Sequence, residues 1–248
     1  MQSRVTLIKC GYYDKDAVEN ALGKALNEIS GWDSSLIPGK AKVLIKPNLL
    51  SARLPEEGVT THPEVLRAII RIFKKYASEI IVGDSPGGYG KNVDEVYEKT
   101  LTKKICAEEG VKLVKFEDPI KVNGIPVTKR LTDCDFFVSV PKFKTHTITT
   151  ITAAVKNSFG LVPGLFKPQS HSTYASVEGF SNFIVDVFSI KPPDLVVCDA
   201  ITAMEGDGPN NGPLKNLNLI AVSDDAVSMD AVMSAIIGLK PFDIFTTR

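Results

Sequence analysis

Lys42-Val-Leu-Ile-Lys46 is a short, mostly apolar run of the kind that forms a buried β-strand. After a loop, Pro63–Tyr76 has the apolar spacing of an amphipathic helix, and a second strand-like run follows at Glu79–Gly83. A strand, a long helix and a further strand in this order are typical of parallel strands joined by a helical crossover. This stretch therefore predicts an α/β fold.

The same alternation of short apolar and longer amphipathic runs continues on both sides of this stretch. It predicts a mostly parallel, doubly wound (Rossmann-like) sheet with helices on both faces. A small β-hairpin is expected at Lys121–Val127, around Asn123-Gly124. The further strands are expected at Val5–Cys10, Val111–Phe116, Asp135–Val140, Asp194–Cys198 and Asn218–Val222, and the further helices at about Asp14–Ile29, Val93–Glu109, Val177–Ser189 and Asp224–Ile237.

Length and charge limit the classes of function. The 248 residues suit a single α/β domain over residues 1–248. Lys plus Arg and Asp plus Glu both number 29, so no overall charge favours nucleic acid or an anionic membrane. No apolar run approaches the roughly 20 residues of a membrane-spanning helix, and the N-terminus lacks a signal-peptide core. We therefore expect a cytoplasmic protein without nucleic-acid or membrane partners.

The four cysteines do not form a recognisable metal-binding pattern. Cys10, Cys106, Cys134 and Cys198 are far apart in sequence, and none belongs to a C-x-x-C pair. We therefore expect no iron–sulfur cluster or zinc ribbon within this chain. Cys134 and Cys198 adjoin strand-like runs, where buried structural thiols are usual.

Ligands of open α/β sheets bind outside the carboxyl ends of the strands. This rule selects the four loops that follow predicted strands. We expect the functional site among them: Pro47–Thr61, Asp84–Lys91, Pro141–Gln169 and Asp199–Pro213.

The third of these loops belongs to an unusual segment without acidic residues. From Phe136 to Val177 there is no Asp or Glu, whereas roughly five would be expected at this composition. A locally cationic surface suits a small phosphate or carboxylate ligand, and a desolvated Lys also suits covalent or acid–base chemistry. Alternatively, the lysines only solvate a loop and a helix face. The basic residues are Lys142, Lys144, His146, Lys156, Lys167 and His171.

A shared role for His146 and Lys156 sets a condition on the backbone between them. On a continuous helix over Thr147–Ser158 they would lie about 15 Å apart along the axis. The β-branched run Thr147-Ile-Thr-Thr-Ile-Thr152 is unfavourable for a regular helix. We therefore expect the chain to be interrupted there.

The other three loops carry weaker patterns, each with a functional and a purely structural interpretation. In Asp84-Ser-Pro-Gly-Gly-Tyr-Gly90, Ser85, Gly87 and Gly88 either approach an anion through the backbone or form a tight turn. Lys46 and Asn48 either contact a ligand or, for Asn48, close an Asx-turn. The acidic residues of the last loop either bind a hard cation or belong to a turn: Asp199, Glu205 and Asp207.

These stretches, in this order along nearly the whole chain, resemble the family known as domain of unknown function 362. Many members add a ferredoxin-like iron–sulfur module, which implies redox work and a ferredoxin-like partner. The chain ends soon after its last predicted helix, so a closing C-terminal element is expected to be missing. The matching stretches are Ile45–Leu50, Thr61–Leu66, Val82–Gly88, Val140–His146, Ala154–Gly164 and Asp199–Pro209.

A more distant similarity, to the N-terminal domain of nickel-dependent lactate racemase, implies particular roles. His146 would be an acid–base catalyst, Lys156 a covalent anchor for a nickel-bearing mononucleotide, and His171 a nickel ligand. The sequence departs from that family where the racemase has a second catalytic histidine, because this chain has Asp84 and Ser85 there. Asp84 would then be either a second acid–base group or a residue that orients a partner.

The leading hypothesis is an enzyme that binds a small anionic ligand, or a divalent metal or metal-bearing nucleotide cofactor, with isomerase or redox-type chemistry. Lys142, Lys144 and Asn157 would bind the ligand beside the residues already named. Two alternatives stay open. One is a carrier that loads a metal or cofactor without turnover; the other is a redox subunit whose lysine-rich loop docks an acidic ferredoxin.

Overall fold

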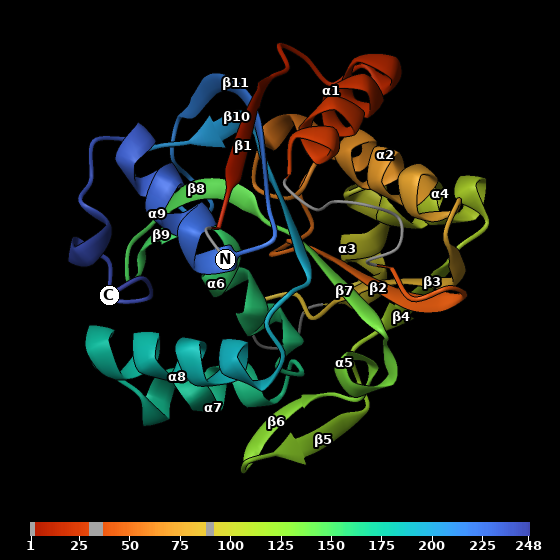
Figure 1. Ribbon diagram of the computed structural model, residues 1–248. Helices are drawn as coiled ribbons and strands as arrows, with labels where there is room; N and C mark the ends of the chain where they lie inside the picture. The colour runs from red at the N-terminus through yellow and green to blue at the C-terminus, as the bar shows by residue number, and fades with distance from the viewer. Residues whose placement is uncertain (1–2, 30–36, 88–91) are drawn as a thin grey trace.

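The computed structural model describes residues 3–29, 37–87 and 92–248, and in these ranges nine strands form one sheet. The main path of the sheet crosses the middle of the molecule (Figure 1). In spatial order its strands are β1 (Val5–Lys9), β11 (Leu214–Ser223), β10 (Leu195–Met204), β7 (Phe136–Val140), β2 (Ala41–Pro47), β3 (Ala77–Asp84) and β4 (Lys112–Lys115), while β8 (Lys142–His146) pairs with β10 and with β9 (Thr150–Thr152).

The centre of the sheet is parallel, as predicted. Strands β10, β7, β2, β3 and β4 pair in parallel, and β8 also runs parallel to β10. Strands β1, β11 and β10 pair antiparallel at one side, and the β8–β9 pair is antiparallel as well. The carboxyl ends of β2, β3 and β7 therefore meet at one edge, where the loops after them come together.

Helices cover both faces, so the doubly wound prediction is confirmed. Apolar residues of α1 (Lys15–Glu28), α2 (Pro63–Phe73) and α4 (Thr102–Glu109) pack in one hydrophobic core. A second core contains residues of α6 (Ala154–Asn157), α8 (Val177–Ile190) and α9 (Ala226–Ile236). In Figure 1, α1 and α2 lie at the upper right and α8 at the lower left of the sheet.

The predicted hairpin is present beneath the sheet in Figure 1. Strands β5 (Pro119–Val122) and β6 (Ile125–Thr128) pair antiparallel around Asn123 and Gly124. Both turn residues have positive φ, 51° and 83°, which is what a two-residue type I′ hairpin requires. The short helix α5 (Arg130–Asp133) follows and leads into β7.

The single helix predicted over Val93–Glu109 is wrong. The structure contains two helices, α3 (Val93–Lys99) and α4, separated by Leu101 in the left-handed conformation with φ 59°. Thr100 reinforces the break, because its hydroxyl donates to the carbonyl of Val96 and so ends α3. Nothing in the side chain of Leu101 favours positive φ, so this interruption had no local signal.

The start of α2 depends on His62 and not on Thr61. His62 is the N-cap of α2, and its Nδ1 accepts from the backbone N–H of Glu64. The Thr61 hydroxyl instead donates to the carbonyl of Val140 and accepts from the N–H of Asn48. Thr61 therefore links the ends of β2 and β7 rather than starting a helix.

Strand β10 is longer than predicted. The predicted strand ended at Cys198, whereas β10 continues to Met204. The extension is stabilised by antiparallel pairing with β11, from Asp199 opposite Ile220 to Met204 opposite Leu214. Asp199 therefore lies within a buried strand and not in a loop.

The chain between His146 and Lys156 is interrupted, as expected from its β-branched residues. A turn follows β8, the strand β9 returns along β8, and α6 begins only at Ala154. The remaining short elements are η3 (Ser158–Leu161), α7 (Phe166–Thr173), η2 (Pro55–Glu57) and η4 (Pro241–Asp243). In the part of the chain described, every helix is too short or too polar to cross a bilayer.

Candidate functional site

A cavity of about 420 Å³ opens at the carboxyl edge of the sheet, where ligand sites of open α/β sheets are found. All four loops selected from the sequence contribute to its wall. Four of the lining side chains are lysines: Lys46, Lys144, Lys156 and Lys167. The other lining residues that matter below are Asn48, Asp84, Ser85, Gly87, His146, Thr152, Asn157, Phe159, Gly160, His171, Pro209 and Asn210.

Asp84 neutralises one of these lysines. Its carboxylate lies 2.9 Å from Nζ of Lys46, and both side chains are buried. The same carboxylate accepts from the backbone N–H groups of Leu49, at 2.7 Å, and Ser85, at 2.9 Å. Burial nevertheless lowers the pKa of Lys46, against the opposing effect of Asp84. With this many partners, Asp84 is placed to orient Lys46 rather than to exchange protons with a ligand.

Gly160 is required by the Lys46–Asp84 pair. A Cβ at this position would lie 2.1 Å from Oδ1 of Asp84 and 2.4 Å from Nζ of Lys46. Its carbonyl also accepts from the N–H of Ser85 at 3.1 Å. The backbone of η3 therefore lies directly against the ion pair, and only glycine permits this approach.

Lys144 extends from β8 and is fixed by oxygen atoms of the first loop. Its Nζ donates to Oδ1 of Asn48 at 3.0 Å and to the carbonyl of Val59 at 2.5 Å. Burial and the charges of Lys156 and Lys142 lower its pKa well below the ordinary value. Asn48 thus has a defined role as the partner of Lys144 and does not close an Asx-turn through this oxygen.

Asn157 connects β2, the loop after it and β7 beneath the cavity. Its Oδ1 accepts from Lys46 at 3.0 Å, and its Nδ2 donates to Oγ of Ser139 at 2.9 Å. Nδ2 of Asn48 lies 3.4 Å from the same Oδ1. Because Asn157 follows Lys156 on α6, these bonds fix the short helix that carries Lys156.

The described part of the glycine-rich turn does not offer backbone N–H groups to an anion. The N–H groups of Ser85 and Gly87 donate to protein carbonyls, those of Gly160 and Leu50. The turn instead presents the carbonyls of Ser85 and Pro86 to Nζ of Lys167. Gly88, predicted to bind the ligand as well, lies outside the described residues. The turn therefore positions a lysine.

Lys156 differs from the other three lysines. Among the residues described, its Nζ forms no hydrogen bond and no ion pair, and its recorded contact is with the ring of Phe159, 5.9 Å from the centroid. Burial, followed by the charge of Lys46, lowers its pKa to about 8. A substantial fraction of this amine is therefore uncharged near neutral to mildly alkaline pH.

His146 is held as a neutral ring. Its Nδ1 accepts from the backbone N–H groups of Ile148, at 3.0 Å, and Thr149, at 3.3 Å. Burial and then the charges of Lys156 and Lys144 lower its pKa to about 2. These hydrogen bonds assign the ring proton to Nε2, so His146 can donate a hydrogen bond to an oxygen of a ligand.

His171 lines the cavity from α7, and its ring packs on aromatic residues. It stacks on Phe180 with centroids 4.3 Å apart and meets the edge of Phe159 at 5.6 Å. Burial and the charges of Lys156 and Lys167 lower its pKa. Its predicted role as a metal ligand is not supported by neighbouring donors, because the described chain contains no group of three or more His, Cys, Asp or Glu residues able to hold a metal ion.

Lys142 and Asp199 belong to a second buried cluster, apart from the cavity. Nζ of Lys142 lies 3.0 Å from Asp199, and the hydroxyl of Tyr13 bridges the two, 2.7 Å from Lys142 and 2.8 Å from Asp199. The backbone N–H of His62 also donates to Asp199. This pairing occupies both residues, so the structure does not place Lys142 beside a ligand or Asp199 beside a metal.

The other two predicted metal ligands, Glu205 and Asp207, have exposed side chains that the structure does not bring to Asp199 or His171. Glu205 instead lies 4.0 Å from Lys215 on β11. The fourth loop contributes Pro209 and Asn210 to the cavity. A metal site built from the predicted carboxylates therefore does not fit this structure.

Asp230 positions α6, and the sequence analysis did not single it out. It lies on α9, and its buried carboxylate accepts from the N–H groups of Ala154, at 2.5 Å, and Val155, at 3.0 Å. Burial raises its pKa to about 7. By satisfying the first N–H groups of α6 it holds the helix that carries Lys156 and Asn157. No sequence signal connects residues so far apart.

The sequence analysis also did not single out Thr152, which contributes its hydroxyl group to the cavity wall. Its Oγ1 is buried and has no hydrogen-bond partner within the described chain. Lys167 was noted only as one of several lysines in the acid-free segment, and that segment was the available signal for it. Together these residues define a cationic cavity in which the one carboxylate, Asp84, is already paired.

The fold and the cavity define an α/β protein with a lysine-lined cavity at the carboxyl edge of its sheet. The sequence model of the family described as "Domain of unknown function (DUF362)" matches residues 43–235. A thylakoid-associated protein of Synechocystis is 30% identical over 253 residues, which cover 99% of this chain and 78% of that protein. The chain belongs to the DUF362 family.

Two solved structures share the fold. The apoprotein of lactate racemase from Thermoanaerobacterium thermosaccharolyticum superimposes with a TM-score of 0.54 at 13% identity, covering 89% of this chain. A protein from Thermotoga maritima gives a TM-score of 0.53 at 12% identity, covering 94% of this chain. This chain spans 54% and 61% of those two chains, respectively. At such identities the similarity shows the fold alone.

Proposed function

We propose that this protein is an enzyme that binds a small anionic ligand in the carboxyl-edge cavity and acts on it with Lys156 and His146. The observation that carries the proposal is the charge of the wall: four lysines, with one carboxylate that is already paired with Lys46. Burial, followed by the charges of Lys156 and Lys142, lowers the pKa of Lys144, so the unliganded cavity disfavours positive charge on this amine. A bound anion favours the charged amine.

Two neutral groups support recognition of a ligand with oxygen atoms. The buried hydroxyl of Thr152 has no partner in the described chain, and a buried polar group is stabilised when it gains a hydrogen bond. His146, with its proton on Nε2, is a donor that needs no charge of its own. A carboxylate or phosphate would supply acceptors to both.

For the cofactor, the proposal keeps a nucleotide-like molecule and leaves out a metal-dependent step. Side chains alone do not form a metal site in the described chain, so no metal-dependent step belongs to the proposal. A nucleotide-like cofactor stays compatible with the cavity because its phosphate is an anion of the kind the lysines suit. The similarity in fold to lactate racemase supports isomerase chemistry only by analogy.

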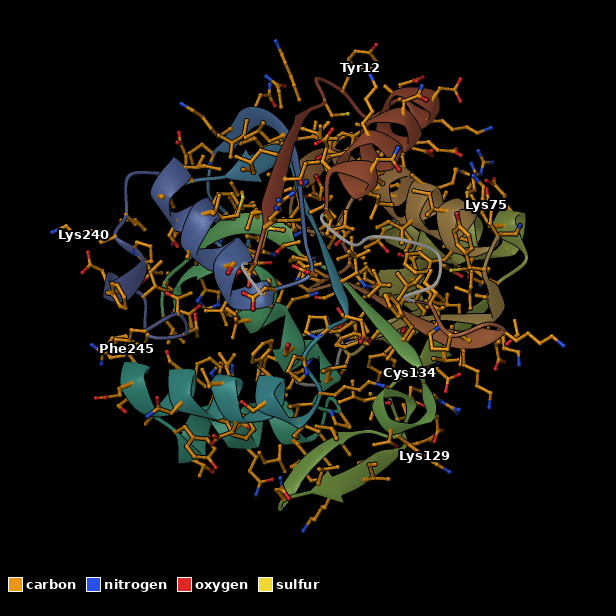
Figure 2. The ribbon with its side chains drawn as sticks, in the orientation of Figure 1. Tyr12, Lys75, Lys129, Cys134, Lys240 and Phe245 are labelled. Atoms are coloured by element: carbon orange, nitrogen blue, oxygen red, sulfur yellow. The ribbon has the colours of Figure 1, made fainter. Side chains whose placement is uncertain are left out.

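Titration calorimetry with oxalate and with inorganic phosphate tests the proposal. Because a bound anion favours the charged amine of Lys156, binding near pH 8 should take up protons, seen as a buffer-dependent heat. Lys156→Met should weaken binding at least about tenfold, since one charge in an enclosed site is lost. Lys129→Met, an exposed site labelled at the periphery in Figure 2, is the matched control.

Native mass spectrometry of the freshly purified protein completes the test. A co-purified anionic molecule, or saturable binding of either probe that Lys156→Met weakens, supports the proposal. The absence of both would overturn it. Saturable binding to the same cavity without turnover of any anionic substrate would remove the catalytic part and favour the carrier.

A further inference from the structure

The four cavity lysines fall into two groups by their hydrogen bonds. Lys46 is held by Asp84, Asn157 and its neighbouring carbonyl, Lys144 by Asn48 and Val59, and Lys167 by two carbonyls of the turn after β3. Each of these three amines is thus tied to oxygen acceptors of the protein. Lys156 has no such acceptor among the described residues. In the part of the chain that the structure describes, its amine is therefore not engaged by a protein acceptor.

We propose that the anionic ligand carries an aldehyde or ketone group, and that Lys156 captures this carbonyl as an imine. This inference rests on the proposed function, because the fixed lysines must first hold the anionic group of the ligand. The substrate class is a small carbonyl compound that carries a carboxylate or a phosphate.

The surroundings of Lys156 meet the requirements of a Schiff-base amine. Such a lysine must be partly uncharged at working pH, and desolvation together with neighbouring cations achieves this. Both effects act on Lys156: burial and the charge of Lys46 lower its pKa to about 8. The ring centroid of Phe159 lies 5.9 Å from the amine, and the ring offers no oxygen or nitrogen acceptor. Its π face attracts the charged form, but burial and the charge of Lys46 still lower the pKa to about 8.

The reaction balances without an oxidant or reductant. The uncharged Nζ attacks the carbonyl carbon, and the C=O electron pair moves to oxygen. A proton transfers from nitrogen to that oxygen to give a carbinolamine. The hydroxyl then gains a proton and leaves as water while the nitrogen lone pair forms the C=N bond of a protonated imine. Loss of the proton on nitrogen returns the proton that was taken up. Amine and carbonyl thus become imine and water.

His146 is positioned to assist as a hydrogen-bond donor. It lines the same cavity, and its Nε2–H is the ring donor left after Nδ1 is occupied by Ile148 and Thr149. A neutral donor at the carbonyl oxygen polarises the C=O bond and stabilises the negative charge that develops there. Imine formation also retains the positive charge once the imine is protonated, so the anionic group of the ligand stays paired.

Reductive trapping tests the inference on the intact wild-type chain. The protein is incubated with glyoxylate or with glyceraldehyde 3-phosphate, reduced with cyanoborohydride, and mapped by peptide mass spectrometry. We expect Lys156 to be modified at least about tenfold more than exposed lysines, because its amine is activated and the anion concentrates there. Lys75, Lys129 and Lys240, at the periphery in Figure 2, are the internal controls.

Three further measurements sharpen the result. Trapping at Lys156 should rise with pH through about 8, following loss of the proton from Nζ. Oxalate, an anion that forms no imine, should suppress trapping at Lys156 and leave the exposed lysines unaffected. Lys156→Arg keeps the charge, so it should still bind oxalate while losing the modification.

The outcomes separate the inference from the proposed function. Oxalate binding without preferential trapping at Lys156 by either aldehyde overturns the imine and leaves the anion site standing. Failure of both binding and trapping overturns both. A preference between the two aldehydes identifies the anionic group, carboxylate or phosphate, and either preference supports the inference.

Discussion

Lys156 lowers the stability of the folded protein at neutral pH. Its pKa in the folded protein, about 8, is below the ordinary 10.5, so the folded state holds the proton less tightly than the unfolded chain. The charged amine therefore lowers the free energy of unfolding below pH 8, and this cost disappears as the pH rises from about 8 towards 10.5. Residues retained at such a cost are commonly functional.

Lys156→Met removes this cost while preserving much of the side-chain volume. We expect the free energy of unfolding to rise by on the order of 2 kcal/mol near pH 7, and the gain to shrink near pH 10. Urea denaturation at the two pH values measures it. A variant that is destabilised equally at both would contradict the assignment of Lys156 as a strained, desolvated amine.

Gly160 provides a second prediction at the scale of one residue. Gly160→Ala places a methyl group against both members of the Lys46–Asp84 pair, so the pair must separate or η3 must move. We expect a loss of about 2–4 kcal/mol in the free energy of unfolding. Gly164→Ala is the control, since its Cβ would meet only Oγ of Ser85 at 3.7 Å. Equal effects of both substitutions would show that the close approach is unimportant.

Helix α6 is the element on which the site depends. It has four residues, too few to be stable alone, and its position is set by Asp230 at its first N–H groups and by Asn157 at its end. The helix thereby fixes Lys156 relative to Lys46. The contacts that stabilise α6 are therefore also the contacts that position the amine of Lys156.

Asp230→Ala leaves the N–H groups of Ala154 and Val155 buried without acceptors. The expected loss is about 2–4 kcal/mol of unfolding free energy, and reductive trapping at Lys156 should fall as α6 loosens. Asp186→Ala, at an exposed position on α8, should change neither quantity. Thermal denaturation and peptide mapping give both readouts. Unchanged trapping in Asp230→Ala would show that α6 is held by other contacts.

At the scale of elements, the periodic patterns predicted the strands, helices and hairpin that depend on residues close in sequence. They did not predict features that depend on pairing with distant strands. The alternation of strands and helices and the Asn123-Gly124 hairpin follow from residues close in sequence. The extension of β10 past Cys198 depends on β11, and the break after α3 places Leu101 at a positive φ that its side chain does not favour. Neither has a local signature.

For the site as well, the sequence predicted what depends on nearby residues and did not predict what depends on distant ones. The carboxyl-edge rule brought four loops together, and the missing acids marked the segment that supplies most of the charge. Which lysine would be free was not predictable, because it depends on acceptors in other loops. Lys142 is an example: its partners Asp199 and Tyr13 lie 57 and 129 residues away, and they remove it from the cavity.

At the scale of the molecule, ligand binding should stabilise the whole fold. The cavity joins loops from four strand ends, so an anion that binds only the folded state raises the unfolding temperature by mass action. We expect oxalate to raise it, and the effect to weaken as pH rises through about 8, because Lys156 then loses its charge. Differential scanning fluorimetry over this range measures it. A pH-independent rise matched by a neutral compound such as glycerol would argue against an ionic site.

The most direct test of the cationic cavity is a crystal structure of the protein with selenate, whose anomalous scattering identifies the anion. The account predicts a selenate in the carboxyl-edge cavity, within hydrogen-bonding distance of Nζ of Lys156 and of the Thr152 hydroxyl. Selenate bound only at surface lysines, with solvent alone beside Lys156, would contradict it.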